Sequence, residues 1–188
     1  MSAYLGSAGA SSFDEDLILV ERFLSGDEQA FGTLYERYYD KVMAISRGIL
    51  IEHEEAADAV QEIFTLVYRH LGRFDRRSRF STWLFRIAVN RSIQHARSTK
   101  HRAKYVPLDE ALTQAEVTEP NITDGDPLVA RVMLQLQPQD RALLTLFYWE
   151  ELSLNEIAES IGCSVNAAKT RLFRARERFR VLYERENA

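Results

Sequence analysis

The sequence predicts an all-α protein of two small helical domains joined by a flexible linker. Apolar residues recur at helical spacing in both halves of the chain, and no segment alternates with the period of a strand. Between residues 98 and 127 this periodicity fails in an acidic segment interrupted by proline and glycine, which is the composition of a linker. With 188 residues, 46% of them apolar, the chain can bury a core in each domain.

The amino-terminal domain is predicted over residues 14–97. The small, Gly- and Ser-rich residues 1–13 before it show no apolar period, and we expect them to form a disordered tail. Gly26 and Asp27 are predicted to separate the first two helices of the domain. The last helix is predicted over 81–97, with Ser81 as its N-cap.

The clearest amphipathic helix of this domain covers residues 54–71. Its apolar positions, Phe64 among them, fall within a narrow arc of a helical wheel and predict a face turned toward the core. The opposite arc is a polar ridge that is compatible with a solvated helix face as well as with a partner surface. The ridge includes Asp58, Gln61, Glu62 and Thr65.

Charge is distributed unevenly along the chain, although the net charge of −4 argues at first against a nucleic-acid partner. Residues 14–68 hold 13 acidic and 4 basic side chains, whereas residues 69–104 hold 11 basic side chains and a single acid, Asp75. Such asymmetry is expected when one part of a protein meets a phosphate backbone and another part meets a different partner.

The carboxy-terminal domain is predicted over residues 128–184. Two helices, 128–136 and 141–149, are expected around a turn at 137–140, and two more helices follow. This last pair has the features of a helix-turn-helix, the most informative pattern in the chain.

Several local signals define the helix-turn-helix. Ser153 and Glu156 have the S-x-x-E spacing of a capping box, which begins the first helix. Gly162 supplies the turn, and Ser164 is placed to cap the second helix. The inner face of this second helix is predicted to carry Val165, Ala168, Leu172, Ala175 and Phe179.

The rest of the second helix is predicted to face DNA, because guanidinium and ammonium groups there can reach guanine edges or phosphate oxygens. Lys169 and Arg174 are the candidates for base edges, and three arginines are candidates for phosphates. The alternative is an ordinary amphipathic helix whose arginines pair with Glu177 and Glu184. The candidate DNA-binding residues are Asn166, Lys169, Thr170, Arg171, Phe173, Arg174, Arg176 and Arg178.

The sequence offers little for catalysis, membrane insertion or metal binding. No run of about 18 apolar residues occurs and the amino terminus has no signal-peptide pattern, so we expect a cytoplasmic protein without membrane insertion. The single cysteine, Cys163, is expected to be a small buried apolar residue. The four histidines lack metal-binding spacing and no phosphate-binding glycine loop exists. We therefore predict no catalytic residue, no cofactor and no metal site.

The whole arrangement resembles the extracytoplasmic-function (ECF) sigma factors of the sigma-70 family, over nearly all of residues 15–184. The resemblance rests on FLSGDEQAFGTLYERYYDKV near the start, on D-x-x-Q-x-x-F at Asp58, Gln61 and Phe64, on FSTWLFRIAVNRSIQ from Phe80, and on the final RLFRARE. It implies a sigma region 2 over 14–97, an acidic linker over 98–127 and a sigma region 4 over 128–184.

The resemblance also implies roles and partners. The ridge of Asp58, Gln61, Glu62 and Thr65 would bind core RNA polymerase, and the helix-turn-helix would bind promoter DNA at the −35 element. The family further implies an anti-sigma factor as a partner. Asn166 and Ala167 stand where family members often have Gly-Thr, which leaves the preferred −35 sequence open.

Residues 74–91 would recognise the −10 element and hold an extruded base, which promotes strand opening. Asn90 sits at the family's base-contact position, and basic residues would hold the backbone. Trp83 has two interpretations, a core aromatic or a stacking platform, and the core is favoured. The implied −10 residues are Arg76, Arg77, Ser78, Arg79, Phe80, Trp83, Arg86, Asn90 and Arg91.

The main alternative is a stand-alone helix-turn-helix regulator that binds operators by itself. That alternative leaves the basic segment over 69–104 and the D-x-x-Q ridge without a function. We therefore expect a sigma factor that directs polymerase to −35 and −10 promoter elements.

Overall fold

The computed structural model describes residues 8–105 and 126–188, with side chains over 15–98 and 126–188. Every regular element in these ranges is helical, which confirms the all-α prediction. The amino-terminal unit consists of α1 (Ala8–Leu24), α2 (Glu28–Leu50), α3 (His53–His70), the short 3₁₀ helix η1 (Leu71–Arg73) and α4 (Phe80–Tyr105). The carboxy-terminal unit consists of α6 (Pro127–Gln135), α7 (Pro138–Leu144), the π-helical turn η2 (Thr145–Trp149), α8 (Leu154–Ile161) and α9 (Val165–Glu186).

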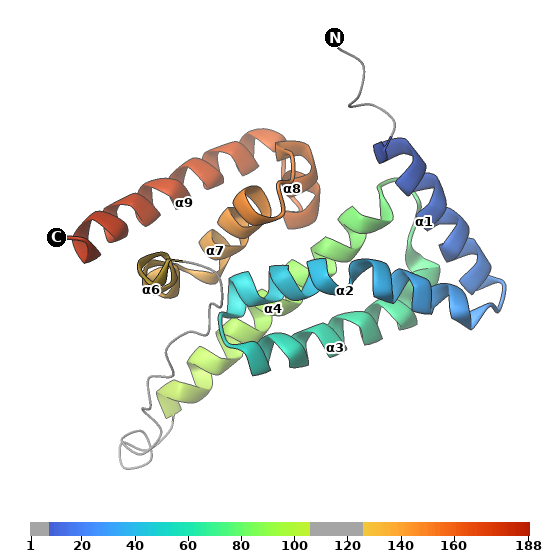
Figure 1. The fold of residues 1–188 in the computed structure, drawn as a ribbon, viewed down its shortest axis with the longest axis horizontal. Helices are drawn as coiled ribbons and strands as arrows, with labels where there is room; N and C mark the ends of the chain where they lie inside the picture. The colour runs from blue at the N-terminus through green and yellow to red at the C-terminus, as the bar shows by residue number, and fades with distance from the viewer. Residues whose placement is uncertain (1–7, 106–125) are drawn as a thin grey trace, which may run out of the picture.

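In the amino-terminal unit α2, α3 and α4 pack against one another, and α1 lies across one end of α2 (Figure 1). Asp27 caps α2 through a hydrogen bond from Gln29 N, which explains the break after Gly26. A buried acid that the sequence pattern did not reveal fastens α1 to α2. Asp16 is 3% exposed and accepts hydrogen bonds from Arg37, at 2.7 Å, and from the hydroxyl of Tyr38.

In the carboxy-terminal unit α9 packs on α6, α7 and α8. Asp126 caps α6 by accepting a hydrogen bond from Leu128 N at 2.8 Å. Pro127 and Pro138 each occupy the first turn of their helix, where a missing amide hydrogen costs nothing because no partner exists there.

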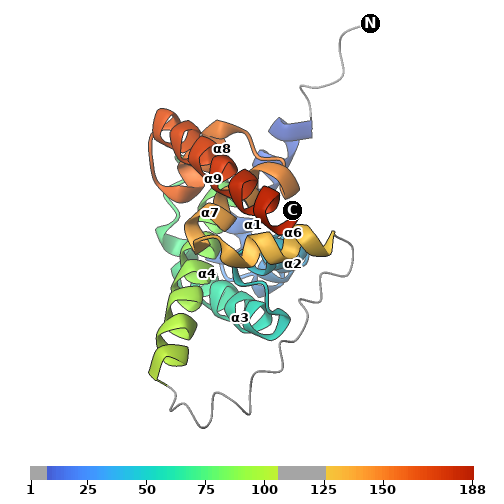
Figure 2. The same cartoon turned by 90° about the vertical axis from the view of Figure 1, so that its left-hand side faces the viewer.

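The two units do not stand apart. One hydrophobic cluster runs through both of them, from Val20 in α1 to Ala175 in α9. At the junction α4 packs against α8, and α2 packs against α7 and η2, as the views in Figures 1 and 2 agree. The described part of the chain is therefore a single packed body rather than two separate cores.

Four boundaries differ from the sequence prediction. In the carboxy-terminal unit α7 begins at Pro138, inside the predicted turn at 137–140, because proline fits the first turn of a helix. The other three lie in the amino-terminal unit. Helix α1 begins at Ala8, inside the predicted tail, and α4 begins at Phe80 rather than after an N-cap at Ser81. Helix α4 also continues to Tyr105, beyond the predicted end at residue 97. Periodicity marks only where an apolar face exists, whereas a helix can continue beyond that face on propensity alone. The rest of the predicted linker, residues 106–125, lies outside the described residues.

Candidate promoter and polymerase interfaces

The helix-turn-helix forms as its capping residues predicted. Ser153 Oγ accepts a hydrogen bond from Glu156 N at 3.3 Å, and Glu156 Oε2 accepts one from Ser153 N at 3.0 Å, which completes the capping box. Gly162 ends α8 in the left-handed region with φ of 70°. Ser164 Oγ then accepts from Ala167 N at 3.2 Å and starts α9.

Helix α9 divides into an inner and an outer face. Ala168, Leu172 and Ala175 are buried against the unit, whereas Phe173 is 62% exposed. Val165, predicted for the inner face, is exposed because it is the first residue of the helix and extends beyond the packing surface. The exposed outer face carries Asn166, Lys169, Thr170, Arg171, Phe173 and Arg174.

Two of the arginines predicted to contact phosphate are engaged inside the unit instead. The Arg176 guanidinium lies over the rings of Phe147 and Tyr148, with its carbon 4.5 and 5.2 Å from the two centroids. Arg178 Nη1 donates to both oxygens of the buried Asp140 carboxylate, at 2.9 and 2.8 Å. Both side chains lie on the flank of α9 that faces α7. Their position around the helix axis therefore determines their role.

The ordinary pairing of arginine with glutamate also occurs on α9, but farther along the helix. Arg180 bonds Glu177 at 3.0 Å and Glu184 at 2.9 Å. Among the described residues no ion pair involves Lys169, Arg171 or Arg174. The charges on the first turns of α9 are thus available to an external anion.

The basic loop before α4 is tied down by ion pairs. Arg76 bonds Glu21 of α1 at 2.9 Å, and Arg77 bonds Asp75 at 2.7 Å. Hydrogen bonds from the backbone and side chain of Arg77 hold the pKa of Asp75 below its usual value. Arg79 approaches Glu156 of α8 at 3.4 Å, so the loop touches the carboxy-terminal unit. Ser78 is half-buried in the same loop.

Two aromatic residues predicted for the −10 element pack against the hydrophobic core. Phe80 is only 1% exposed, and its ring packs on those of Tyr38 and Phe74 at 5.5 and 5.9 Å between centroids, so it is a core residue and no DNA contact. Trp83 is partly buried and packs on Phe74 and Phe80, at 5.4 and 6.0 Å between centroids, as the core interpretation expects. Phe80 was predicted wrongly because the sequence at the start of a helix does not show whether an aromatic side chain faces the core or the solvent.

Arg86 and Asn90 are exposed on α4. The two side chains are four residues apart on one helix, so they lie on the same side of α4. Arg91, the next basic residue, is half-buried and turns toward α3 instead, with its Nε 3.8 Å from Glu62.

The polar ridge of α3 stands exposed as expected, while Phe64 is 5% exposed beneath it. Residues of α4 join the ridge, a contribution the sequence did not predict. His95 Nε2 lies 3.0 Å from Glu62 Oε2. This hydrogen bond holds the pKa of Glu62 below its usual value. The exposed ridge consists of Asp58, Gln61, Glu62 and Thr65.

Other kinds of site find little support in the described part of the chain. No group of three or more His, Cys, Asp or Glu side chains is placed to hold a metal ion there. No helix in the same ranges is long and apolar enough to cross a membrane. Cys163 is half-buried in the turn between α8 and α9 rather than fully buried as predicted, because the turn lies at the surface.

Comparison with protein families gives two matches that follow one another along the chain. The family described as "Sigma-70 region 2" matches residues 34–102, and that described as "Sigma-70, region 4" matches residues 128–179. These two segments run from within α2 to within α4 and from α6 to within α9.

Known proteins match the chain over most of its length. The RNA polymerase sigma-H factor of Pseudomonas aeruginosa is 36% identical over 87% of this chain and 91% of its own. The ECF RNA polymerase sigma factor SigW of Bacillus subtilis is 32% identical over 86% and 92%. The solved structure of CnrH in complex with the cytosolic domain of CnrY is similar, with a TM-score of 0.67, 27% identity and coverage of 90% of this chain and 97% of that one.

Proposed function

Because the chain belongs to the sigma-70 family, as an ECF sigma factor, we propose that its two helical units divide promoter recognition between them. The protein directs transcription initiation by RNA polymerase. In our proposal residues 14–97 bind polymerase and read the −10 element, and residues 128–184 read the −35 element. The basic and acidic segments of the chain then each have a function.

The observation that carries this proposal is the outer face of α9. Lys169, Phe173 and Arg174 are exposed on a helix held by α8 in a capped helix-turn-helix. Such a helix fits the major groove, where arginine can donate to guanine O6 and N7 and an apolar ring can contact the thymine methyl group. Asn166, Thr170 and Arg171 flank them, and we propose that these six side chains form the −35 surface.

We assign the −10 element to the loop before α4 and to the exposed side of that helix. Asn90 contacts an unstacked base in this proposal, and the basic side chains hold the single strand. Exposed ion pairs such as Arg77 with Asp75 contribute at most about 1 kcal/mol, so phosphates can replace them. In this proposal Trp83 packs on Phe74 and Phe80 beneath the −10 surface and fixes its position. The proposed strand contacts are Arg76, Arg77, Ser78, Arg79, Arg86 and Arg91.

The ridge of Asp58, Gln61, Glu62 and Thr65 is the proposed contact with the clamp helices of core polymerase. Its side chains are exposed on a rigid helix whose opposite face is buried, which presents them at fixed spacing. His95 forms a hydrogen bond with Glu62, and Arg91 Nε lies 3.8 Å from the same carboxylate, so the proposed polymerase contact and the −10 helix meet at Glu62.

An anti-sigma protein is the further partner we propose, since the similar protein CnrH was solved in complex with the cytosolic domain of CnrY. Sigma factors are transcription initiation factors rather than enzymes, and we propose no catalytic residue, cofactor or metal. The place of action is then the cytoplasm, with RNA polymerase.

Run-off transcription with core polymerase, followed by sequencing of the start sites, tests the proposal. We expect start sites that share a −35 and a −10 sequence, and mobility shifts that are sequence-specific chiefly when polymerase is present. Tight, specific binding by the isolated protein together with no transcription would instead favour the stand-alone regulator.

A further inference from the structure

The loop that we assign to the −10 strand, residues 74–79, contains a residue in a strained backbone conformation. Arg76 has a φ of 61°, in the left-handed region that residues with a side chain rarely adopt. Phe74 and Phe80 are buried at the two ends of the loop, whereas Arg76 and Arg77 between them are exposed. Strain of this kind persists only where neighbouring contacts maintain it. The buried ends alone do not fix Arg76, so a contact with the middle of the loop is needed.

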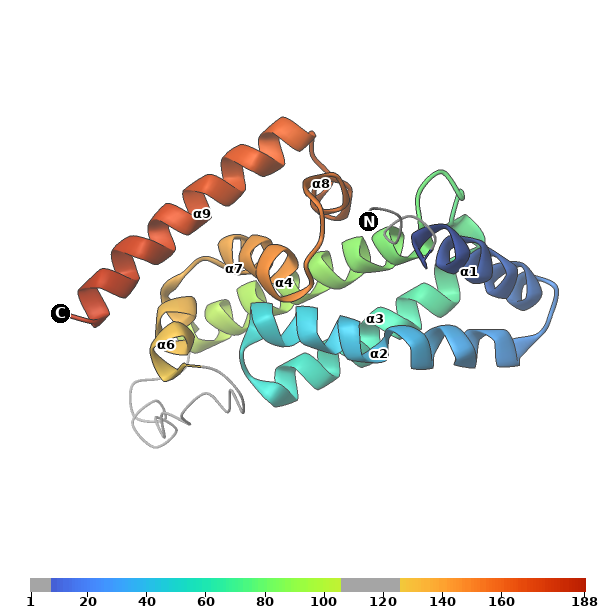
Figure 3. The ribbon, with the colours of Figure 1, turned by 45° about the horizontal axis from the view of Figure 1, so that its top comes forward.

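Glu21 of α1 supplies that contact. Its Oε1 lies 2.9 Å from Nη1 of Arg76. Figure 3 shows the loop between α3 and α4 passing beside α1. At the entry to the loop the end of α1 packs against η1, where a Cβ on Gly72 would stand 3.7 Å from Leu24 Cδ2. Helix α1 therefore contacts both the entry to the loop and its strained residue.

Helix α1 is itself fixed by an anchor that also contacts the start of α4. The buried Asp16 of α1 accepts hydrogen bonds from Arg37 and from the hydroxyl of Tyr38, both in α2. The Tyr38 ring packs on Phe80 and Phe85, with 5.5 and 6.2 Å between centroids. One tyrosine thus joins α1 to the first turns of α4, so the side of α1 that carries Glu21 is held at a fixed place beside the loop.

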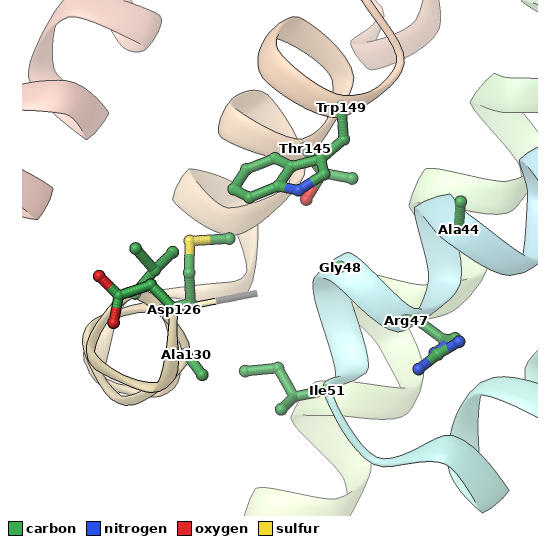
Figure 4. Close-up of a pocket in the computed structure, with 10 residues that line it drawn as sticks. Ala44, Arg47, Gly48, Ile51, Asp126, Ala130, Thr145 and Trp149 are labelled. Atoms are coloured by element: carbon green, nitrogen blue, oxygen red, sulfur yellow. The ribbon is translucent and has the colours of Figure 1, made fainter. Parts of the chain in front are cut away.

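The loop has a second tie, but this one depends on the carboxy-terminal unit. Arg79 lies 3.4 Å from Glu156 of α8, across the junction of the two units. At another point of that junction Gly48 of α2 faces Thr145 of η2, as Figure 4 shows. A Cβ on Gly48 would stand 2.5 Å from Thr145 Cγ2, so no side chain fits there. Gly48 lies about 15 Å farther along α2 than Tyr38, at about 1.5 Å per residue, so the contacts of α1 with the loop do not involve the junction.

We propose that α1 is the positioning element of the −10 loop and that Glu21 is the residue through which it acts. Glu21 holds Arg76 in the left-handed turn, and the turn presents the polar side chains that follow it to the strand. Affinity increases because the loop is ordered before it binds. The inference rests on the proposed function and narrows its set of strand contacts, since it assigns the Arg76 side chain to the loop.

Exchange of the two charges tests this role. Glu21→Arg and Arg76→Glu each place like charges together, and the double variant restores a pair of opposite charges. The readout is the affinity of the protein with core polymerase for a promoter fragment whose non-template −10 strand is unpaired. We expect each single variant to bind about 5-fold more weakly, the most that an exposed ion pair contributes, and the double variant to bind like the parent.

The sign of the Glu21→Arg effect separates positioning from a direct strand contact. An added positive charge by itself favours DNA binding, and so does an Arg76 released from its carboxylate. Glu36→Arg is the matched control, because Glu36 is exposed on α2 and the charge change is the same. We expect this control to bind at least as tightly as the parent. Unchanged or tighter binding by Glu21→Arg, or a double variant as weak as Arg76→Glu, overturns the proposal.

Two substitutions of Arg76 test the strained turn itself. Both Arg76→Gly and Arg76→Ala remove the guanidinium, but only glycine adopts a φ of 61° without strain. We expect Arg76→Gly to lose less affinity for the strand than Arg76→Ala, while urea unfolding gives the same stability for parent and Arg76→Ala within error. Equal losses of affinity would identify the guanidinium as a strand contact and contradict the positioning role.

The effect of Glu21→Arg should also be independent of the junction between the units. The same fold-loss is expected in a Gly48→Ala background and in its matched control Gly32→Ala, where a Cβ meets nothing within 4 Å. A loss that disappears in Gly48→Ala would show that Glu21 acts through the carboxy-terminal unit, against the proposal. Failure of the proposed function would be seen separately, as an absence of run-off transcription by the parent protein.

Discussion

At the scale of single residues, rotation about one helix separates arginines that look alike in the sequence. Successive side chains turn by about 100°, so Arg174 faces outward while Arg176 and Arg178 fall on the flank near α7. Arg176 stacks on aromatic rings and Arg178 neutralises Asp140. The same residue type is therefore exposed for a ligand at position 174 and engaged within the fold at positions 176 and 178.

Arg174→Ala should relax the preference at one −35 position by about 1 to 3 kcal/mol, because a guanidinium that reads a base edge is lost. Competition binding with each base at each −35 position measures this. Arg180→Ala is the control, since Arg180 is occupied by Glu177 and Glu184. A uniform loss across all bases would identify Arg174 as a phosphate contact.

Arg178→Ala should lower the free energy of unfolding by about 1 to 3 kcal/mol and leave −35 preference unchanged. Removing Arg178 leaves the Asp140 carboxylate, which is only 8% exposed, without its ion-pair partner. The loss of stability is limited because the Arg178 side chain is itself half-exposed, so solvent already weakens the pair. Urea unfolding gives the stability, and the same competition assay gives the preference. If Arg178→Ala instead changed the base preference and left stability unchanged, Arg178 would be assigned to the DNA-binding surface.

Asn90→Ala should weaken transcription from a −10-dependent promoter by about 10-fold, the effect expected when one base contact is lost. Asn90 is exposed and outside the polymerase ridge, so binding to core polymerase should be unchanged. Transcription and polymerase affinity are measured in parallel. Equal losses in both would mean that Asn90 supports the polymerase interface instead.

At the scale of elements, capping determines how the helix-turn-helix is oriented. The Ser153 and Glu156 box begins α8, the left-handed Gly162 ends it, and Ser164 begins α9 only two residues later. With both ends of the turn fixed by hydrogen bonds, the angle between α8 and α9 has little freedom. The outer face of α9 is thereby presented in one orientation.

Ser153→Ala should cost about 1 kcal/mol of stability at neutral pH, the usual value of an N-cap. Burial raises the pKa of Glu156, but hydrogen bonds from Ser153 and the nearby positive charges outweigh it and hold the pKa below its usual value. A lowered pKa stabilises the fold above the unfolded value of 4.5, and this contribution is lost as the pH falls through the folded value. The cost of Ser153→Ala should therefore shrink below about pH 4.5, as urea unfolding at several pH values would reveal. If the stability lost in Ser153→Ala does not change with pH, ionisation of Glu156 does not contribute to the cap.

At the scale of the whole molecule, a shared core joins the two helical units. Ile157 and Ala158 of α8 belong to the same buried cluster as Leu84 and Ala88 of α4. Unfolding one unit would therefore expose apolar surface of the other, which couples their stabilities.

Thermal unfolding of the free protein should accordingly be one transition, with equal calorimetric and van't Hoff enthalpies. Gly48→Ala should separate it into two transitions, because the crossing with Thr145 no longer fits, whereas Gly32→Ala should keep one. Differential scanning calorimetry decides between these outcomes. Two resolved transitions in the parent would show that the units unfold independently.

The sequence by itself determined the all-α class, the caps of the helix-turn-helix and the outer face of α9. These features depend on groups within about four residues of one another, as Ser153 and Glu156 illustrate, so a local pattern contains the whole cause. The family motifs around Asp58, Phe80 and Arg174 likewise lie within single segments, and they identified the family before any packing was known.

Only the tertiary structure decided which polar groups are used internally and how the two units meet. Asp16 and Arg37, Asp140 and Arg178, and Gly48 and Thr145 are partners separated by 21 residues or more along the chain. No sequence periodicity relates residues so far apart. A glycine such as Gly48 also has no side chain whose polarity could indicate a contact. Long-range packing and desolvation select such pairs only when the helices have been brought together, within each unit for the two ion pairs and between the units for Gly48 and Thr145.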